Sequence, residues 1–387
     1  MIYRSKDIYT KIKDGPESLG DDEFSNLVDS GTITDEMLLN AFSDLRLKLA
    51  QNFKLDHISF LTGNGCSIYA GSKSTLEFNI SDAVEKDKLD LLSDVIAKIS
   101  GMPLEEELNA LLTIQEFYHI MGDDKEHIVS EIITNLKSYL LNNYVNSVEY
   151  SKLTYHEALL LKLRSFGCLK KVNLYTLNYD LTLEYILDKL SIDYENGFSG
   201  FVNRKFDPRT LQFPDKTKLV KIHGSVNWVY DVDDRIIKET QPKFEDGKVK
   251  VEDAEHVLIY PTEQKLYQTY NAPYSELMRS MLDGFETGRN LILVLGYKYG
   301  DEHINEILYK AVANPNNVFY FFDYAGGNNA FIQRMIELSN STQNINIFLG
   351  RFLGDFTKFV KYMMPANAEK TDEERIFELL GKVLNHD

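Results

Sequence analysis

A hydroxyl, an amide and a carboxylate fall within one short stretch, KVNLYTLNYD. They belong to Thr176, Asn178 and Asp180, which follow a β-branched and apolar run typical of a buried strand. The carboxyl ends of strands in open α/β sheets face the ligand crevice, so these groups are well placed to orient a small molecule. Capping is the alternative, in which Asp180 or Asn178 accepts the first free N–H groups of a helix that begins near Leu181.

A glycine-rich turn forms the second candidate group, Gly63, Asn64, Gly65, Cys66 and Ser67. The preceding residues, His57 to Thr62, are apolar enough to predict a buried strand. The glycines predict a tight turn into a helix that opens near Ser67. Such a turn lets backbone N–H groups approach a pyrophosphate.

Three more polar or glycine-containing groups follow predicted strands. His223-Gly224 ends the strand KLVKI, Gly296-Tyr297 ends the continuously apolar run LILVL, and Asp323 ends NVFYFF. An acidic residue at the end of a later strand can bind ribose hydroxyls. The alternatives are a buried structural histidine at His223 and a turn cap at Asp323.

The elements that must position these groups alternate between strands and helices. This alternation predicts an α/β fold, a Rossmann-like doubly wound parallel sheet with connections of one hand. Since the carboxyl ends of parallel strands meet along one edge, the five groups are expected to gather there as a dinucleotide site. A long helical pattern over about 81–163 predicts a helical insertion, and both termini also have helical patterns.

Composition restricts the function. The chain has 387 residues with 42 basic and 59 acidic side chains, so direct nucleic-acid binding is not expected. Its two cysteines, Cys66 and Cys168, are too few for a disulfide framework or a four-cysteine zinc site, and no metal is expected. No signal peptide or membrane span is recognisable in the sequence, which predicts a cytoplasmic protein without membrane contact.

The order of these motifs resembles the sirtuin-like (silent information regulator type) NAD-binding family. The family's glycine-alanine-glycine loop, threonine-glutamine-asparagine turn and catalytic histidine-glycine pair correspond to Gly63 to Ser67, Thr176 to Asp180 and His223-Gly224. The later segment GYKYGDEHIN looks like one common in bacterial sirtuin-like proteins of antiviral defence. Asn64 replaces the usual alanine and Leu177 the glutamine. The zinc ribbon that classical deacylases carry is absent from the sequence.

The resemblance implies roles for these residues. Asn178 orients the nicotinamide ribose and the attacking water, and His223 acts as general base. Asp180 positions the nicotinamide carboxamide or orients the asparagine. The remaining residues are expected to bind the substrate NAD, with the pyrophosphate on the glycine loop and Ser67 and the adenosine ribose on Asp323; this binding set comprises Gly63, Asn64, Gly65, Ser67, Thr176, Gly296, Tyr297 and Asp323.

The resemblance also implies a domain plan and a function. The plan is a helical arm over 1–55, a sirtuin-like NAD-binding catalytic domain over 56–350 and a helical tail over 351–387. Whether the arm covers the core or forms an oligomer contact is left open. The function is NAD+ hydrolysis to nicotinamide and ADP-ribose, as an effector of antiviral defence through abortive infection, in a homo-oligomer or with a HerA-type ATPase. The alternatives are an NAD-dependent protein deacylase and a non-catalytic module that senses NAD or ADP-ribose.

Overall fold

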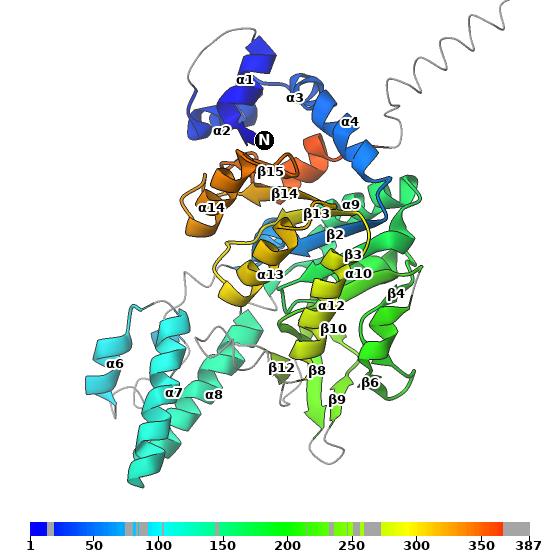
Figure 1. The fold of residues 1–387 in the computed structure, drawn as a ribbon. Coiled ribbons are helices and arrows are strands. Elements are labelled where there is room, and N and C mark those ends of the chain that lie inside the picture. Colours follow the sequence, from blue (N-terminus) through cyan, green and yellow to red (C-terminus); the bar gives the residue numbers. More distant parts are fainter. Residues whose placement is uncertain are drawn as a thin grey trace, which may run out of the picture.

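The computed structural model describes residues 1–13, 19–73, 80–82, 84, 92–102, 104–143, 147–213, 215–231, 236–245, 247–250, 256–258 and 272–366. Its centre is an eight-stranded sheet in the order β1-β15-β14-β13-β2-β3-β7-β4 (Figure 1). Every neighbouring pair in this sheet is parallel. The strands are β1 (Ile2–Arg4), β2 (His57–Thr62), β3 (Val172–Thr176), β4 (Tyr194–Glu195), β7 (Thr217–Lys221), β13 (Asn290–Leu295), β14 (Asn317–Asp323) and β15 (Ile345–Leu349).

The six central strands have the Rossmann order. Numbered along the chain, β7-β3-β2-β13-β14-β15 is 3-2-1-4-5-6, with the order reversing between β2 and β13. The predicted Rossmann-like doubly wound α/β fold is therefore confirmed. The reversal point is where the carboxyl ends of strands open a crevice, so it is the expected place for a ligand.

Alternate strand residues pack on opposite faces of the sheet. Leu291 and Leu293 of β13 belong to one hydrophobic core, and Ile292 and Val294 belong to another. The first core is covered by α4 (Ser43–Asn52), α9 (Thr154–Ser165), α10 (Thr182–Lys189) and α15 (Phe356–Lys358). The second is covered by α12 (Tyr274–Glu286), α13 (Glu302–Val312) and α14 (Ala330–Ser339).

The predicted helical insertion contains helices with a core of their own. Residues of α6 (Ser93–Ile99), α7 (Leu104–Met121) and α8 (Lys125–Asn143) form a separate apolar cluster that includes Ile96, Leu111 and Leu136. Figure 1 shows these helices standing away from the main sheet. By contrast, α9 packs its Leu160 and Leu163 into the main core. The apolar stripes of these helices are thus accounted for by packing.

The amino-terminal segment is part of the main body. β1 pairs with β15 at the sheet edge, which the sequence analysis did not predict. Side chains such as Phe24, Leu38 and Leu49 are fully buried in the first core, so the arm covers that core. The helices before α4 are α1 (Ser5–Lys13), α2 (Asp21–Asp29) and α3 (Asp35–Ala41).

The predicted carboxyl-terminal tail is described only as far as residue 366. Phe352, Phe359 and Met363 are buried in the first core, and residues 359–363 form a π-helical turn after α15. Residues 367–387 of the predicted tail lie outside the described residues. The described part of the tail therefore contributes to the core.

A second sheet is antiparallel, and its strand β8 begins directly after His223. Its order is β12-β8-β9-β6-β5, with β5 (Phe198–Ser199), β6 (Arg204–Phe206), β8 (Gly224–Asp231), β9 (Ile236–Glu239) and β12 (His256–Leu258). A separate antiparallel pair joins β10 (Lys243–Glu245) to β11 (Lys248–Lys250), and Val249 of β11 is buried in the first core. None of the described helices is long and apolar enough to cross a lipid bilayer.

Candidate functional site

The register of β3 and β7 brings two predicted catalytic residues to one edge. Thr176 is paired with Lys221 at the ends of these strands. Asn178 and His223 each lie two residues beyond that pair. Because neighbouring strands are about 4.8 Å apart, both residues emerge side by side at the carboxyl edge of the sheet.

The side chain of Asn178 points toward the glycine turn. Its Nδ2 lies 3.4 Å from the carbonyl oxygen of Gly63 and 3.4 Å from Oγ of Ser67. Its backbone N–H donates to Oγ1 of Thr176 at 3.1 Å. Ser67 and Thr176 are buried, whereas Asn178 is partly exposed. Two predicted site residues, Gly63 and Ser67, therefore contact the side-chain amide of Asn178, and a third, Thr176, holds its backbone.

Asp180 has the capping role that the sequence left open. Its Oδ1 accepts the N–H of Thr182 at 3.0 Å, at the start of α10. Its backbone carbonyl accepts a hydrogen bond from the buried Nζ of Lys221, which also donates to the carbonyl of Tyr179 at 3.2 Å. The turn that carries Asn178 is thus fixed by contacts on both sides.

The glycines allow two turns to approach closely. A Cβ on Gly63 would lie 2.6 Å from the carbonyl oxygen of Gly296, and one on Gly65 would lie 2.7 Å from its Cα. The N–H groups of Gly63 and Gly65 donate to the carbonyls of Leu295 and Gly296 at 3.0 and 2.9 Å. These two N–H groups bind the neighbouring turn, so close packing is the role that the structure gives these glycines.

The helix predicted to open near Ser67 is present as a short 3₁₀ helix, with Ser67 at its N-cap. It covers Ile68–Ala70 and follows another short 3₁₀ turn, Asn64–Cys66. Gly71 follows them in a left-handed conformation with φ +96°, which ends the helical path after Ala70. Ser67 therefore lies at a junction of short turns and not in the first turn of an α-helix.

Asn64 holds the loop together through its side chain. Its Nδ2 donates to the carbonyl of Lys73 at 2.9 Å, and its Oδ1 accepts from Ser72. Asn64 thus closes the loop that follows the glycine turn. Its amide links parts of this loop to each other, which an alanine at this position could not do.

His223 is buried and in contact with a second histidine. Only 4% of its surface is exposed, and its Nε2 lies 3.1 Å from Nε2 of His303, which is 7% exposed. Gly224 follows with φ +89° and turns the chain into β8. His303 lies in the first turn of α13, 80 residues along the chain. Sequence reasoning missed this residue, although GYKYGDEHIN places it just after a strand end.

Tyr297 fixes the turn before α13. Its hydroxyl accepts the N–H of Asp301 at 2.9 Å, and its one proton faces two acceptors, the carbonyl of Asp301 at 3.0 Å and Oδ1 of Asn305 at 3.2 Å. The ring is 7% exposed. Tyr297 therefore binds the backbone that carries Asp301, while Gly296 supplies the φ of +62° that the turn needs.

Asp323 closes the turn after β14. Its carboxylate accepts the N–H groups of Ala325 at 3.3 Å and Gly327 at 2.5 Å, as its capping alternative requires. Burial raises the pKa of Asp323, although the hydrogen bonds from Gly327 and Ala325 oppose this shift. A carboxylate has more acceptor positions than these two bonds use, but Asp323 is only 3% exposed.

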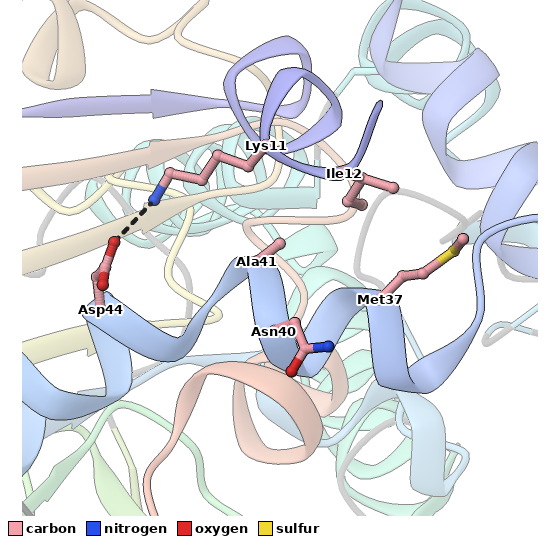
Figure 2. Close-up of a pocket in the computed structure, with 6 residues that line it drawn as sticks. All are labelled: Lys11, Ile12, Met37, Asn40, Ala41 and Asp44. Carbon is pink, nitrogen blue, oxygen red and sulfur yellow. Dashed lines mark ion pairs between the residues drawn. The ribbon is translucent and has the colours of Figure 1, made fainter. Parts of the chain in front are cut away.

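A hollow of about 310 Å³ lies elsewhere, between the amino-terminal helices. Figure 2 shows its lining, with an ion pair of 3.6 Å between Lys11 and Asp44 at one side. It is formed by residues of α1, α3 and α4, and none of the predicted site residues contributes to it. The strand-end site is therefore defined by its side chains and hydrogen bonds and not by this hollow.

Comparison with known proteins gives one family match. Residues 172–347 match the model of the family described as a SIR2-like domain. The matched segment includes Asn178, His223, His303 and Asp323 and begins after the glycine turn. The comparison with curated proteins returned no match.

Solved structures similar to the chain include sirtuins. One, titled as the structural basis of sirtuin substrate affinity, has a TM-score of 0.41 at 13% identity and covers 82% of this chain and 96% of its own. A Sir2 homologue in complex with NAD has a TM-score of 0.39 at 13% identity, covering 81% and 91%. A Sir2 protein bound to a propionylated peptide has a TM-score of 0.39 at 13% identity and covers 86% of this chain and 98% of its own. The fold assignment rests on the strand order given above.

Proposed function

We propose that this protein cleaves NAD+ with water to give nicotinamide and ADP-ribose. The observation that carries the proposal is the placement of Asn178 and His223 two residues beyond the paired ends of β3 and β7. The amide of Asn178 faces the glycine turn at the Rossmann reversal point. Both residues lie within the segment that matches the SIR2-like domain.

The chemistry that this pair can support starts with the leaving group. Nicotinamide is cationic in NAD+ and departs neutral, so it needs no proton from a general acid. As its bond to ribose C1′ breaks, positive charge develops on the ribose, as in glycoside hydrolysis. Water forms the new bond to C1′ and gives up one proton. Fixed dipoles and a nearby base are therefore the groups that the site must supply.

Each of these functions is assigned to a particular residue of the site. Asn178 orients the ribose and the water through an amide held by Ser67 and the carbonyl of Gly63. His223 receives the proton released by the attacking water or by a ribose hydroxyl. Thr176 and Asp180 hold the turn through the bonds described above, and Asp323 accepts from the adenosine ribose.

The direct test measures both products. Purified protein is incubated with NAD+, and nicotinamide and ADP-ribose are separated by chromatography, with and without an acetylated peptide. We expect ADP-ribose without peptide, and its loss in Asn178→Ala and His223→Ala. The matched controls are Asn40→Ala and His119→Gln, which change exposed residues. Nicotinamide that appears only with peptide would make the protein a deacylase, and turnover by both site variants would remove this mechanism.

The biological role is proposed from the resemblance of GYKYGDEHIN to bacterial defence proteins. The protein acts as a cytoplasmic effector of abortive infection, assembled with copies of itself or with a HerA-type ATPase. Bacteria that carry it with its neighbouring genes should lose NAD+ after phage infection, and the Asn178→Ala strain should not. Unchanged NAD+ levels in infected cells, together with activity of the purified protein, would separate the enzyme from the defence role.

A further inference from the structure

We propose that His223, His303 and Asp301 bind a zinc-class divalent cation, and that this cation switches the enzyme off by occupying His223. The three side chains are here called the two-histidine cluster. The binding part stands on geometry alone, whereas the inhibitory part rests on the proposed function. The sequence analysis expects no metal because two cysteines are too few for a four-cysteine zinc site. His223 and His303 are 80 residues apart in the chain, and only folding brings them together.

The distances fit a single ion. Nε2 of His223 and Nε2 of His303 are 3.1 Å apart. Zinc binds imidazole nitrogen at about 2.0–2.1 Å, so two nitrogens on one ion lie roughly 3.0–3.4 Å from each other. The ring centroids are 5.3 Å apart and the two Nε2 atoms face each other, so a rotation of the rings is needed before both lone pairs point to one cation. One possible ligand atom of each cluster residue lies within 4.8 Å of the other two, so the Asp301 carboxylate moves closer to the imidazoles when it binds the ion.

The fold positions all three ligands before an ion arrives. His223 lies between the end of β7 and the start of β8, where Gly224 sets the direction of the chain. Asp301 and His303 occupy the N-cap and the second residue of α13. The hydroxyl of Tyr297 binds both the N–H and the carbonyl of Asp301. Ligands on such fixed backbone lose little freedom when they bind a metal.

The donor set selects the class of cation. Two imidazoles with one carboxylate suit zinc and similar transition metals, whereas Mg²⁺ and Ca²⁺ prefer oxygen ligands. Three protein ligands also leave a fourth position for water. Both histidines are almost fully buried, so a bound ion would be shielded by protein on the side of the rings.

The proposed inhibition follows from the fact that a neutral imidazole has a single nitrogen lone pair that can accept a proton. A neutral imidazole has one N–H and one lone pair. A cation on Nε2 uses the lone pair, and the proton is then on Nδ1. Whichever nitrogen serves as the base, His223 can no longer accept a proton while the ion is bound. Zinc is therefore expected to inhibit NAD+ cleavage and chelation to restore it.

The binding test uses the full chain freed of metal with a chelator and then titrated with zinc chloride by calorimetry. We expect one site per chain, weakened at least about tenfold by His303→Gln and by Asp301→Asn. The control is His119→Gln, which removes an exposed histidine that lies 3.3 Å from Glu126, a surface pair able to bind zinc adventitiously. Circular dichroism establishes that each variant is folded, and Asp301→Asn preserves shape if His303→Gln does not fold. Zinc binding that both variants leave unchanged, or no binding, overturns the proposal.

The inhibition test compares each protein with its own zinc-free rate. We expect the zinc concentration for half inhibition to rise at least about tenfold in Asp301→Asn. If zinc binds through His303 but no NAD+ cleavage occurs in any condition, the proposed function fails and the metal site stands. If NAD+ is cleaved and zinc has no effect on the rate, the enzyme stands and the inhibitory part is overturned.

Discussion

Nζ of Lys221 lies 3.0 Å from Oε1 of Glu184, and both residues are buried, Lys221 to 1% exposure. The same ammonium donates to the carbonyls of Tyr179 and Asp180 in the turn that carries Asn178. Burial raises the pKa of Glu184, and the charge of Lys221 opposes this shift. One buried lysine therefore connects the core to the position of the proposed catalytic amide.

Replacement of this lysine should affect stability and activity separately. Lys221→Met leaves the Glu184 carboxylate without its cationic partner, so we expect a loss of about 3–5 kcal/mol in the free energy of unfolding. Adding Glu184→Leu removes the unpaired carboxyl group and should recover most of that loss. The double variant still lacks the bonds to Tyr179 and Asp180, so its NAD+ turnover should stay low. Urea unfolding and product chromatography measure the two effects, and full activity of the double variant would show that these bonds do not position Asn178.

The contact between the two glycine turns gives a second prediction. Gly296→Ala would put a Cβ 2.4 Å from the backbone nitrogen of Cys66, at a φ of +62° that disfavours alanine. We expect a loss of about 1–3 kcal/mol in the free energy of unfolding, and a similar loss for Gly63→Ala. Gly300→Ala is the matched control, because its Cβ would meet nothing within 4 Å. Equal stability of the three variants in thermal unfolding would contradict the close packing described here.

The sequence could predict most of the sheet because its signals are local. Leu291 to Leu295 is a continuous apolar run, and the structure has β13 over Asn290–Leu295. The prediction of β2 over His57 to Thr62 is confirmed residue for residue. By contrast, β1 has only three residues and gains its stability from β15 at the other end of the chain. No local pattern identifies such a strand.

The site could be predicted less completely, because some of its contacts join residues that are far apart in the sequence. Asn178 and His223 follow strand ends and could be chosen from the sequence. His303 could not be joined to His223, because 80 residues separate them and only the packing of α13 against the strand ends brings them into contact. The helix expected near Ser67 is only one 3₁₀ turn long, since Gly71 adopts a left-handed conformation and ends it after Ala70.

Buried His156 gives a prediction of pH dependence. Burial lowers its pKa to about 3, and its Nδ1 lies 2.8 Å from the hydroxyl of Tyr69. An unfolded histidine takes up a proton below about pH 6.5, whereas the folded one stays neutral until about pH 3, so stability is present above pH 6.5 and is lost as the pH falls. Protonation of this histidine in the unfolded chain should lower the free energy of unfolding by about 1.4 kcal/mol when the pH falls from about 7.5 to about 5.5.

The measurement is chemical unfolding at both pH values for the native protein and for His156→Gln. Other groups also titrate, so the quantity of interest is the difference between the two proteins. The variant should lose less stability on acidification, by about the amount given above. His119→Gln, which removes an exposed histidine, is the control and should follow the native protein. The same pH dependence in native protein and His156→Gln would mean that His156 is not buried in its neutral form.

The last prediction concerns the contact between Ser67 and Asn178. Oγ of Ser67 is fully buried and lies 3.4 Å from Nδ2 of Asn178, on the side of the amide that faces the glycine turn. Ser67→Ala removes an acceptor that orients this amide but keeps the carbonyl of Gly63, so we expect kcat to fall about tenfold, equivalent to about 1.4 kcal/mol, with little change in KM. Ser25→Ala on α2 is the control, since its hydroxyl donates to the carbonyl of Asp21 within its own helix. A rise in KM with unchanged kcat would instead assign Ser67 to substrate binding, because uniform binding contributes equally to the ground and transition states.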